Sequence, residues 1–288
     1  MAGTGFLVVW CAVLGVFAAL GYGRSLAGTS RAQRAVRVGA RIERVDVPPH
    51  RADSGRGVPA VLVFQNPADG QILTLPTTGG GNRTLHVAWV GRRIGVRFPP
   101  GKPHKFRVVE RPSGRVPRGL VAPTIALLLI AAALVGSFAF AHGYGWALLG
   151  GGALWTGLMV AALRVGSRRA AERKALLASA VSVPGRVVSV LEHTATDDEG
   201  RTRTTYTPVV TFTTYDGTVV TGLCSAGIRD ARRSLGRELP VHYAPADPAV
   251  FTADVTADRR SVGCGLFFLG LFALGGVALM VVGMGAVL

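Results

Sequence analysis

The side chains that could do chemistry are few and lie far apart in this chain. Six histidines are present, and no two lie at the four-residue spacing of a metal-binding helix: His50, His86, His104, His142, His193 and His242. His242 falls on an expected strand beside Tyr243, where a solvated strand face accounts for it. The histidines therefore predict no metal site.

The acidic side chains also lack a catalytic or metal-binding arrangement. The acidic run Asp197-Asp198-Glu199 has neither the spacing nor the turn glycine of a calcium-binding loop, so we interpret it as a solvated loop. Asp247 lies between two prolines, where its side chain can cap backbone N–H groups in a turn. Asp69 and Asp216 each precede a glycine, as in many hairpin turns.

The cysteines and glycines add no site. The three cysteines, Cys11, Cys224 and Cys264, form no Cys-x-x-Cys pair, which argues against a zinc site and favours small buried side chains. The sequence lacks the glycine patterns of nucleotide-binding loops and of hydrolase nucleophiles. Gly150-Gly151-Gly152 lies in an apolar run, where small residues let helices approach closely. The sequence thus predicts no catalytic residue, no cofactor and no metal ligand.

Three uncharged apolar runs dominate the elements around these residues. Of the 288 residues, 49% are hydrophobic and 17% charged, with a mean hydropathy of +0.38. The runs cover 3–23, 119–163 and 261–288, and about 20 apolar residues span a bilayer as a helix. The middle run would be roughly 68 Å long as one helix, so we expect a break at 141–145 and two spans there.

The sequence therefore predicts an α+β membrane protein with four transmembrane helices. Their expected ranges are 3–23, 119–141, 145–165 with a basic helical extension to 180, and 261–286. The first span is expected to be retained, because residues 1–5 carry none of the Lys or Arg that a signal peptide needs.

The net charge is +16, and groups of basic residues lie beside one end of each span. Lys and Arg near the spans are Arg24, Arg31, Arg34, Arg37, Arg111, Arg115, Arg118, Arg164, Arg168, Arg169, Arg173, Lys174, Arg259 and Arg260. Positive charge near span ends marks the cytoplasmic side. We expect a multi-pass cell-membrane protein with both polar segments cytoplasmic and both termini and the central turn outside. The juxtamembrane arginines would contact anionic lipid headgroups of the bilayer, and no nucleic acid is expected.

The two halves of the chain resemble each other at a fixed spacing. Gly91-Arg92 opens a segment that matches the one opened by Gly236-Arg237, an offset of 236 − 91 = 145 residues. The segment 38–45 matches 183–190 at the same offset, and Val61-Leu62-Val63-Phe64 matches Val209-Val210-Thr211-Phe212. We expect a tandem duplication of a unit made of a span, a β-module and a second span.

Each polar segment is expected to fold as a small five-stranded β-module. The first module, at 36–110, is expected to be a diverged copy of the second, at 183–255. An OB-like barrel is one candidate topology for these modules. In the second module, the pattern predicts three strands, a helix at 228–235 and two last strands separated by residues 244–248. The loop at 194–203 is expected to be mobile and exposed.

The second module resembles a bacterial domain-of-unknown-function family, DUF3592. The resemblance rests on Gly185-Arg186-Val187-Val188, on Tyr206-Thr207-Pro208 with the strand that follows, and on Asp216-Gly217 and 236–248. It implies a membrane protein with a β-rich segment between spans, and it implies no activity and no catalytic residue.

Three functional hypotheses follow. The favoured one is a non-enzymatic membrane anchor or interaction protein that presents its β-modules to an unknown protein partner or to the membrane surface. The first alternative is a transport or pore accessory subunit, although spans without Asp, Glu, Lys or Arg argue against a coupled transporter. The second alternative is a membrane-tethered enzyme, which the absence of a catalytic pattern disfavours.

Overall fold

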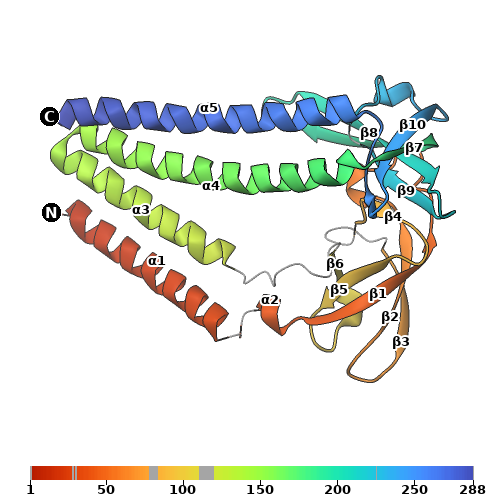
Figure 1. Ribbon diagram of the computed structural model, residues 1–288. Coiled ribbons are helices and arrows are strands. Elements are labelled where there is room, and N and C mark those ends of the chain that lie inside the picture. The colour runs from red at the N-terminus through yellow and green to blue at the C-terminus, as the bar shows by residue number, and fades with distance from the viewer. Residues whose placement is uncertain are drawn as a thin grey trace. The chain divides into compact units, whose positions relative to one another are not determined.

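The computed structural model describes residues 2–27, 29, 31–77, 84–109, 120–224 and 226–287 (Figure 1). The chain divides into two compact units. One contains the apolar helices (1–34, 115–170 and 263–288) and the other contains the strands (35–114 and 171–262). Each unit is described by itself below.

The structure contains four helices that are long and apolar enough to cross a membrane: α1 (Ala2–Leu26), α3 (Val121–His142), α4 (Tyr144–Ala178) and α5 (Val255–Val287). The break expected at 141–145 is confirmed. Gly143 separates α3 from α4 with a φ of 97°, a backbone conformation that favours glycine, and its N–H bonds to the Ala139 carbonyl.

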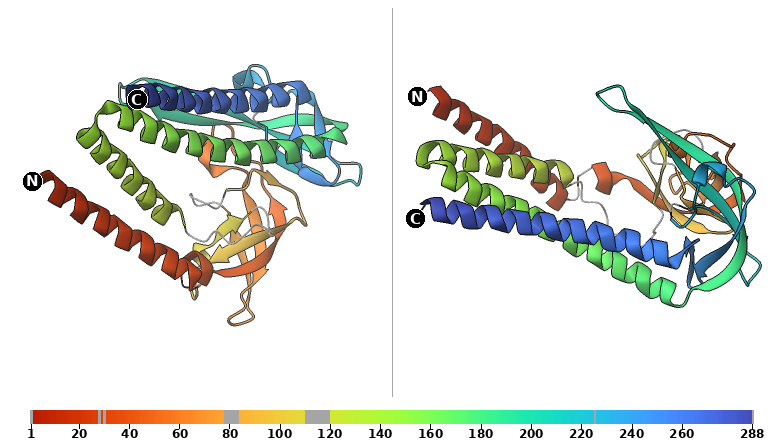
Figure 2. Two further views of the ribbon diagram at one scale, coloured as in Figure 1. Left: turned by 60° about the vertical axis from the view of Figure 1, so that its left-hand side comes forward. Right: turned by 90° about the horizontal axis from the view of Figure 1, so that it is seen from above.

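Glycines lie at close contacts between helices of the helical unit (Figure 2 shows the helices from two further sides). A Cβ on Gly152 would lie 2.7 Å from the Gly276 carbonyl oxygen of α5, and one on Gly150 would overlap Val135 of α3. The helix contact predicted for 150–152 is therefore confirmed for its first and third glycines. A Cβ on Gly151 would meet nothing within 4 Å.

The first half of the chain forms a five-stranded antiparallel sheet. Its strands are β1 (Val36–Val45), β2 (Ala60–Gln65), β3 (Ile72–Pro76), β5 (Arg93–Phe98) and β6 (Arg107–Val109), in the order β3-β2-β1-β5-β6. Short helical turns accompany them: α2 (Arg31–Arg34), η1 (Ser54–Arg56) and η2 (Pro103–Lys105). In β1 the side chains alternate, so that Ala40 and Ile42 are buried while Arg37 and Arg41 are exposed.

The second half forms a six-stranded sheet in the order β11-β10-β7-β8-β9-β4. Its strands are β7 (Val181–Thr196), β8 (Thr202–Thr213), β9 (Val219–Leu223), β10 (Glu238–Ala244) and β11 (Asp247–Thr252), with η3 (Ala231–Arg233) between β9 and β10. The sixth strand, β4 (Val87–Ala88), comes from the first half and pairs antiparallel with β9. The sheet therefore has one strand more than the five expected.

Two local expectations for the second half are wrong. The helix expected at 228–235 is only the 3-10 turn η3, because Asp230 adopts a left-handed φ of 50° that interrupts helical geometry. Residues 244–248 do not all separate the last strands, since Ala244 pairs directly with Asp247 across the turn Pro245-Ala246. Among the described strands, no pairing closes either sheet into the OB-like barrel considered above.

The two sheets share one strand order and one register. All six pairs between β1 and β5, from Val36↔Phe98 to Arg41↔Arg93, recur 145 residues later between β7 and β10. The register shift between Ile42 and Arg44 recurs between Val187 and Ser189. The order β3-β2-β1-β5-β6 corresponds strand by strand to β9-β8-β7-β10-β11.

A glycine fixes this shared register in each sheet. Gly91 donates its N–H to the Ile42 carbonyl at 2.8 Å, and Gly236 donates to the Val187 carbonyl at the same distance. Both glycines have positive φ, 86° and 76°, which side-chain-bearing residues rarely adopt. The motif noted in the sequence therefore acts as a turn that enters the central strand pair.

The two halves do not form independent modules, because they share a hydrophobic core. Leu191 and Val209 of the second half are fully buried within the cluster that contains Ile42, Leu62 and Phe98 of the first. A second cluster is formed by side chains from all five strands of the second half and includes Val87 of β4. The strands of both halves therefore fold as one unit.

We expect Leu191→Ala to destabilise the strands of the first half as well as those of the second. Removing a fully buried leucine should lower the free energy of unfolding by about 2–5 kcal/mol. Hydrogen exchange on the full chain in detergent should speed up in β1 and β2. Val219→Ala, on an exposed side chain of β9, is the control, and loss of protection confined to the second half would contradict the shared core.

We expect Gly276→Leu to destabilise the α4–α5 contact. Its side chain would overlap the Thr156 hydroxyl and the ring of Trp155, which should cost about 1–3 kcal/mol. The adjacent Gly275→Leu is a matched control, because a Cβ there meets nothing within 4 Å. Thermal unfolding in detergent measures both, and equal midpoints would show that α4 and α5 do not pack through this glycine.

Candidate functional site

The region expected to be a mobile loop at 194–203 is largely a two-stranded ribbon. Pairing between β7 and β8 continues outward to Thr196↔Thr202. At the tip, Asp197 Oδ1 accepts hydrogen bonds from the backbone N–H groups of Glu199 and Arg201, at 3.1 and 2.7 Å. The acidic run thus forms an exposed capped turn, and the described part of the chain brings no group of three acidic, histidine or cysteine side chains into metal-binding proximity.

The base of this ribbon is attached to the first half. The Arg51 N–H donates to the Val190 carbonyl, and the Glu192 N–H donates to the Ala52 carbonyl. Arg51 also pairs with the Glu192 carboxylate at 3.4 Å. The polar loop that follows β1 therefore aligns with β7 through backbone bonds, which orients the ribbon relative to the five-stranded sheet.

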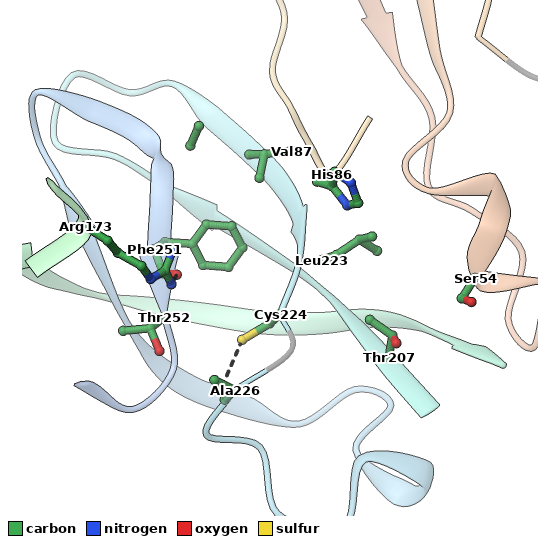
Figure 3. A pocket seen from close by; sticks show the side chains of 11 residues that line it. Ser54, His86, Val87, Arg173, Thr207, Leu223, Cys224, Ala226, Phe251 and Thr252 are labelled. Carbon is green, nitrogen blue, oxygen red and sulfur yellow. Dashed lines mark hydrogen bonds between the residues drawn. The ribbon is translucent and has the colours of Figure 1, made fainter. Parts of the chain in front are cut away.

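A pocket of about 480 Å³ lies where β4, β9 and β11 meet the end of α4 (Figure 3). Its walls combine apolar side chains with hydroxyls, one thiol, one imidazole and one guanidinium: Ser54, His86, Val87, Arg173, Thr207, Leu223, Cys224, Ala226, Ala249, Phe251 and Thr252. Because β4 supplies part of one wall, the pocket exists only when both halves are folded together.

Arg173 holds the end of the pocket at which α4 meets β11. Its Nε and Nη2 atoms donate to the Asp258 carboxylate at 2.9–3.3 Å, and Nη2 also donates to the Phe251 carbonyl at 3.2 Å. Asp258 is mostly buried, so this two-pronged ion pair neutralises a carboxylate that would be costly to leave alone. The pair joins α4, β11 and the start of α5.

Cys224 forms part of the pocket wall as a buried thiol. Its Sγ–H donates to the Ala226 carbonyl at 3.3 Å, the interaction drawn in Figure 3. Burial raises the pKa of the Cys224 thiol, although backbone hydrogen bonds and the charge of Arg173 partly oppose this shift. A protonated, hydrogen-bonded thiol is a poor nucleophile.

The remaining residues considered from the sequence have local structural roles. Asp247 Oδ1 accepts from the Ala249 N–H at 3.1 Å, which confirms its turn-capping role. Asp216 lies in the β8–β9 turn, and hydrogen bonds from the Thr214 and Thr218 hydroxyls lower the pKa of its carboxyl. The side chain of His242 belongs to β10, at a position half exposed to solvent.

Sequence reasoning missed a cluster of arginines on the strands. The arginine excess was assigned to the membrane edge, yet five arginines lie on one face of the five-stranded sheet: Arg37, Arg41, Arg93, Arg97 and Arg107. The period-two spacing of Arg37 and Arg41, and of Arg93 and Arg97, could have indicated this face. Only the strand register shows that Arg37 and Arg41 of β1 lie opposite Arg97 and Arg93 of β5.

A family model described as Domain of unknown function (DUF3592) matches residues 183–257. The match covers most of the six-stranded sheet, from β7 to the start of α5, and it confirms the resemblance noted in the second half. No curated protein and no solved structure matches the chain.

We expect Cys224 to react slowly with iodoacetamide in a Cys11→Ser/Cys264→Ser chain. Because burial raises its pKa, the alkylation rate should keep rising above pH 9 and at neutral pH should be below that of the unfolded chain. Mass spectrometry of the 224-containing peptide measures the rate. A plateau below pH 8 would indicate an activated thiol and favour the enzyme hypothesis.

Proposed function

We propose that this chain is a multi-pass membrane protein that acts as a non-enzymatic anchor and interaction protein. The observation that carries the proposal is that strands from both halves form one unit directly continuous with long apolar helices. β7 begins three residues after α4 ends at Ala178, and α5 begins three residues after β11 ends at Thr252. The strands are thus joined in sequence to the helices that would anchor them in the bilayer.

The pocket and the ribbon are the candidate contact surfaces of this unit. The pocket is of the size that small ligands use, and the ribbon presents a threonine-rich surface around Thr194, Thr196, Thr202 and Thr204. Both depend on the shared core, so deletion of 183–255 would also remove Leu191 and Val209 from the core of the first half. A test of binding therefore needs point substitutions.

The duplication belongs to this proposal. Three observations support descent of both halves from one unit. They are the identical strand registers at an offset of 145 residues, the repeated bulge and the two corresponding glycines. A unit with two spans preserves its orientation when it is repeated. The strands would then lie on the same side of the membrane, and the arginine distribution favours the cytoplasm.

This topology is tested with one added cysteine in the Cys11→Ser/Cys264→Ser chain, in which the remaining Cys224 is buried. We expect Tyr144→Cys, at the first residue of α4 on a side chain that is 72% exposed, to react with an impermeant maleimide in intact cells. Asp198→Cys at the ribbon tip should react only after the membrane is permeabilised. The reverse result would overturn the cytoplasmic assignment.

The interaction role is tested by photocrosslinking in native membranes. A benzophenone at Asp198 should give a discrete protein adduct, whereas one at Leu271, an exposed apolar side chain of α5, should react mainly with lipid. An adduct obtained only from Leu271 would favour the transport or pore accessory alternative, because the spans would then be the contacting part.

A further inference from the structure

We propose that the exposed face of the five-stranded sheet binds the phosphate groups of anionic phospholipids. The face is formed by the five strand arginines named above, which we call the arginine face: Arg37, Arg41, Arg93, Arg97 and Arg107. This surface is distinct from the pocket, and of its five arginines only Arg37 was also counted among those beside a span end. The proposal extends the anchoring function proposed above. It rests on that function, because only a protein that sits in a membrane would have phospholipid phosphates beside this face.

The strand register gathers these arginines into two rows. Arg37 pairs directly with Arg97, and Arg97 pairs directly with Arg107, so three guanidinium groups lie side by side on neighbouring strands. Arg41 pairs with Arg93 to form the second row. Four residues along a strand separate the rows, a distance of about 13 Å, and neighbouring strands are about 4.8 Å apart. The face therefore presents five positive charges over a small area.

The arginines on this face form no ion pairs in the part of the chain that the structure describes. Like charges directly opposite one another on a sheet destabilise it, so the arrangement costs the free protein stability. Bound phosphate groups would remove that repulsion, since guanidinium groups bind phosphate oxygens with charge-assisted hydrogen bonds.

The other half of the molecule shows that the fold does not require these arginines. At an offset of 145 residues, the five positions are occupied by Ser182, Arg186, Glu238, His242 and Thr252. Those residues form the same strand pairs, Ser182↔His242↔Thr252 and Arg186↔Glu238. One arginine remains there and it faces a glutamate, so the uncompensated charge belongs to the first half alone and points to a ligand.

The centre of the face is open. Gly39 and Gly95 pair with each other between the two rows, and a Cβ on Gly39 would meet nothing within 4 Å. The one aromatic residue of β1, β5 and β6 is Phe98, whose side chain is buried on the opposite face. A flat basic surface without exposed aromatic rings suits lipid phosphates better than the stacked bases of a single-stranded nucleic acid.

The short connections between this sheet and the helices also favour a lipid bilayer as the source of the bound phosphate groups. Only ten Cα–Cα steps connect Leu26, the end of α1, to Val36, the start of β1, which limits their separation to roughly 35 Å. Twelve steps connect Val109 of β6 to Val121 of α3. If α1 and α3 span a bilayer, its headgroups are within reach of this face at high local concentration.

The test uses the full Cys11→Ser/Cys264→Ser chain in nanodiscs with a polarity-sensitive fluorophore at Gly39→Cys. We expect its emission to shift to the blue as phosphatidylglycerol replaces phosphatidylcholine, and the shift to reverse at high salt. The triple variant Arg37→Ser/Arg97→His/Arg107→Thr replaces three arginines with the residues at the corresponding positions of the second half, Ser182, His242 and Thr252, which form the same strand pairs there. It should weaken phosphatidylglycerol binding on the order of a hundredfold and abolish the shift.

Matched variants control for net charge and folding. Arg203→Gln/Arg229→Gln/Arg233→Gln removes the same charge from exposed positions and should retain the shift. Arg93→Glu, which copies the Arg186↔Glu238 pair, should also weaken binding without loss of thermal stability. Failure to insert into nanodiscs would refute the anchoring function itself.

Three results would overturn the proposal about the arginine face. They are an equal shift in pure phosphatidylcholine, an unchanged shift in the triple variant of the face, and a shift produced by inorganic phosphate or an RNA oligonucleotide but not by phosphatidylglycerol.

Discussion

The structure depends on a hydrophobic core to which both halves of the chain contribute. Leu191 and Val209 reach into the core of the first half, and β4 pairs with β9 of the second half. Burial of large apolar side chains is the main favourable term in folding, and here it is divided between segments from both halves of the chain. The pocket follows from the same arrangement, because β4 lines one of its walls.

Within each sheet, a second constraint acts on the backbone. A glycine with positive φ enters the central pair and donates its N–H to the strand residue that precedes a bulge. This geometry recurs at an offset of 145 residues while most side chains around it differ. Backbone conformation and hydrogen bonding are therefore what both halves retain, which explains why the Gly-Arg motif is visible in the sequence although it forms no site.

The halves differ in how they use the surfaces that this common framework provides. The second half places Ser182, His242 and Thr252 in one cross-strand row, where the first half places three arginines. The second half also contains the buried thiol and contributes most of the pocket wall. Sheet pairing tolerates either set, so these side chains are free to carry separate binding functions on related strands.

The sequence alone determined the local features of the protein. Uncharged runs long enough for a bilayer predicted the four helices, residues 141–145 predicted the break within the middle run, and hairpin turns such as Asp216-Gly217 marked the strands. These features depend on neighbouring residues, so periodicity and glycine positions suffice. Tertiary structure decided the exchange of β4, the burial of Leu191 and the assembly of the arginine face. Those depend on strand register and on contacts between distant segments, which no local pattern contains.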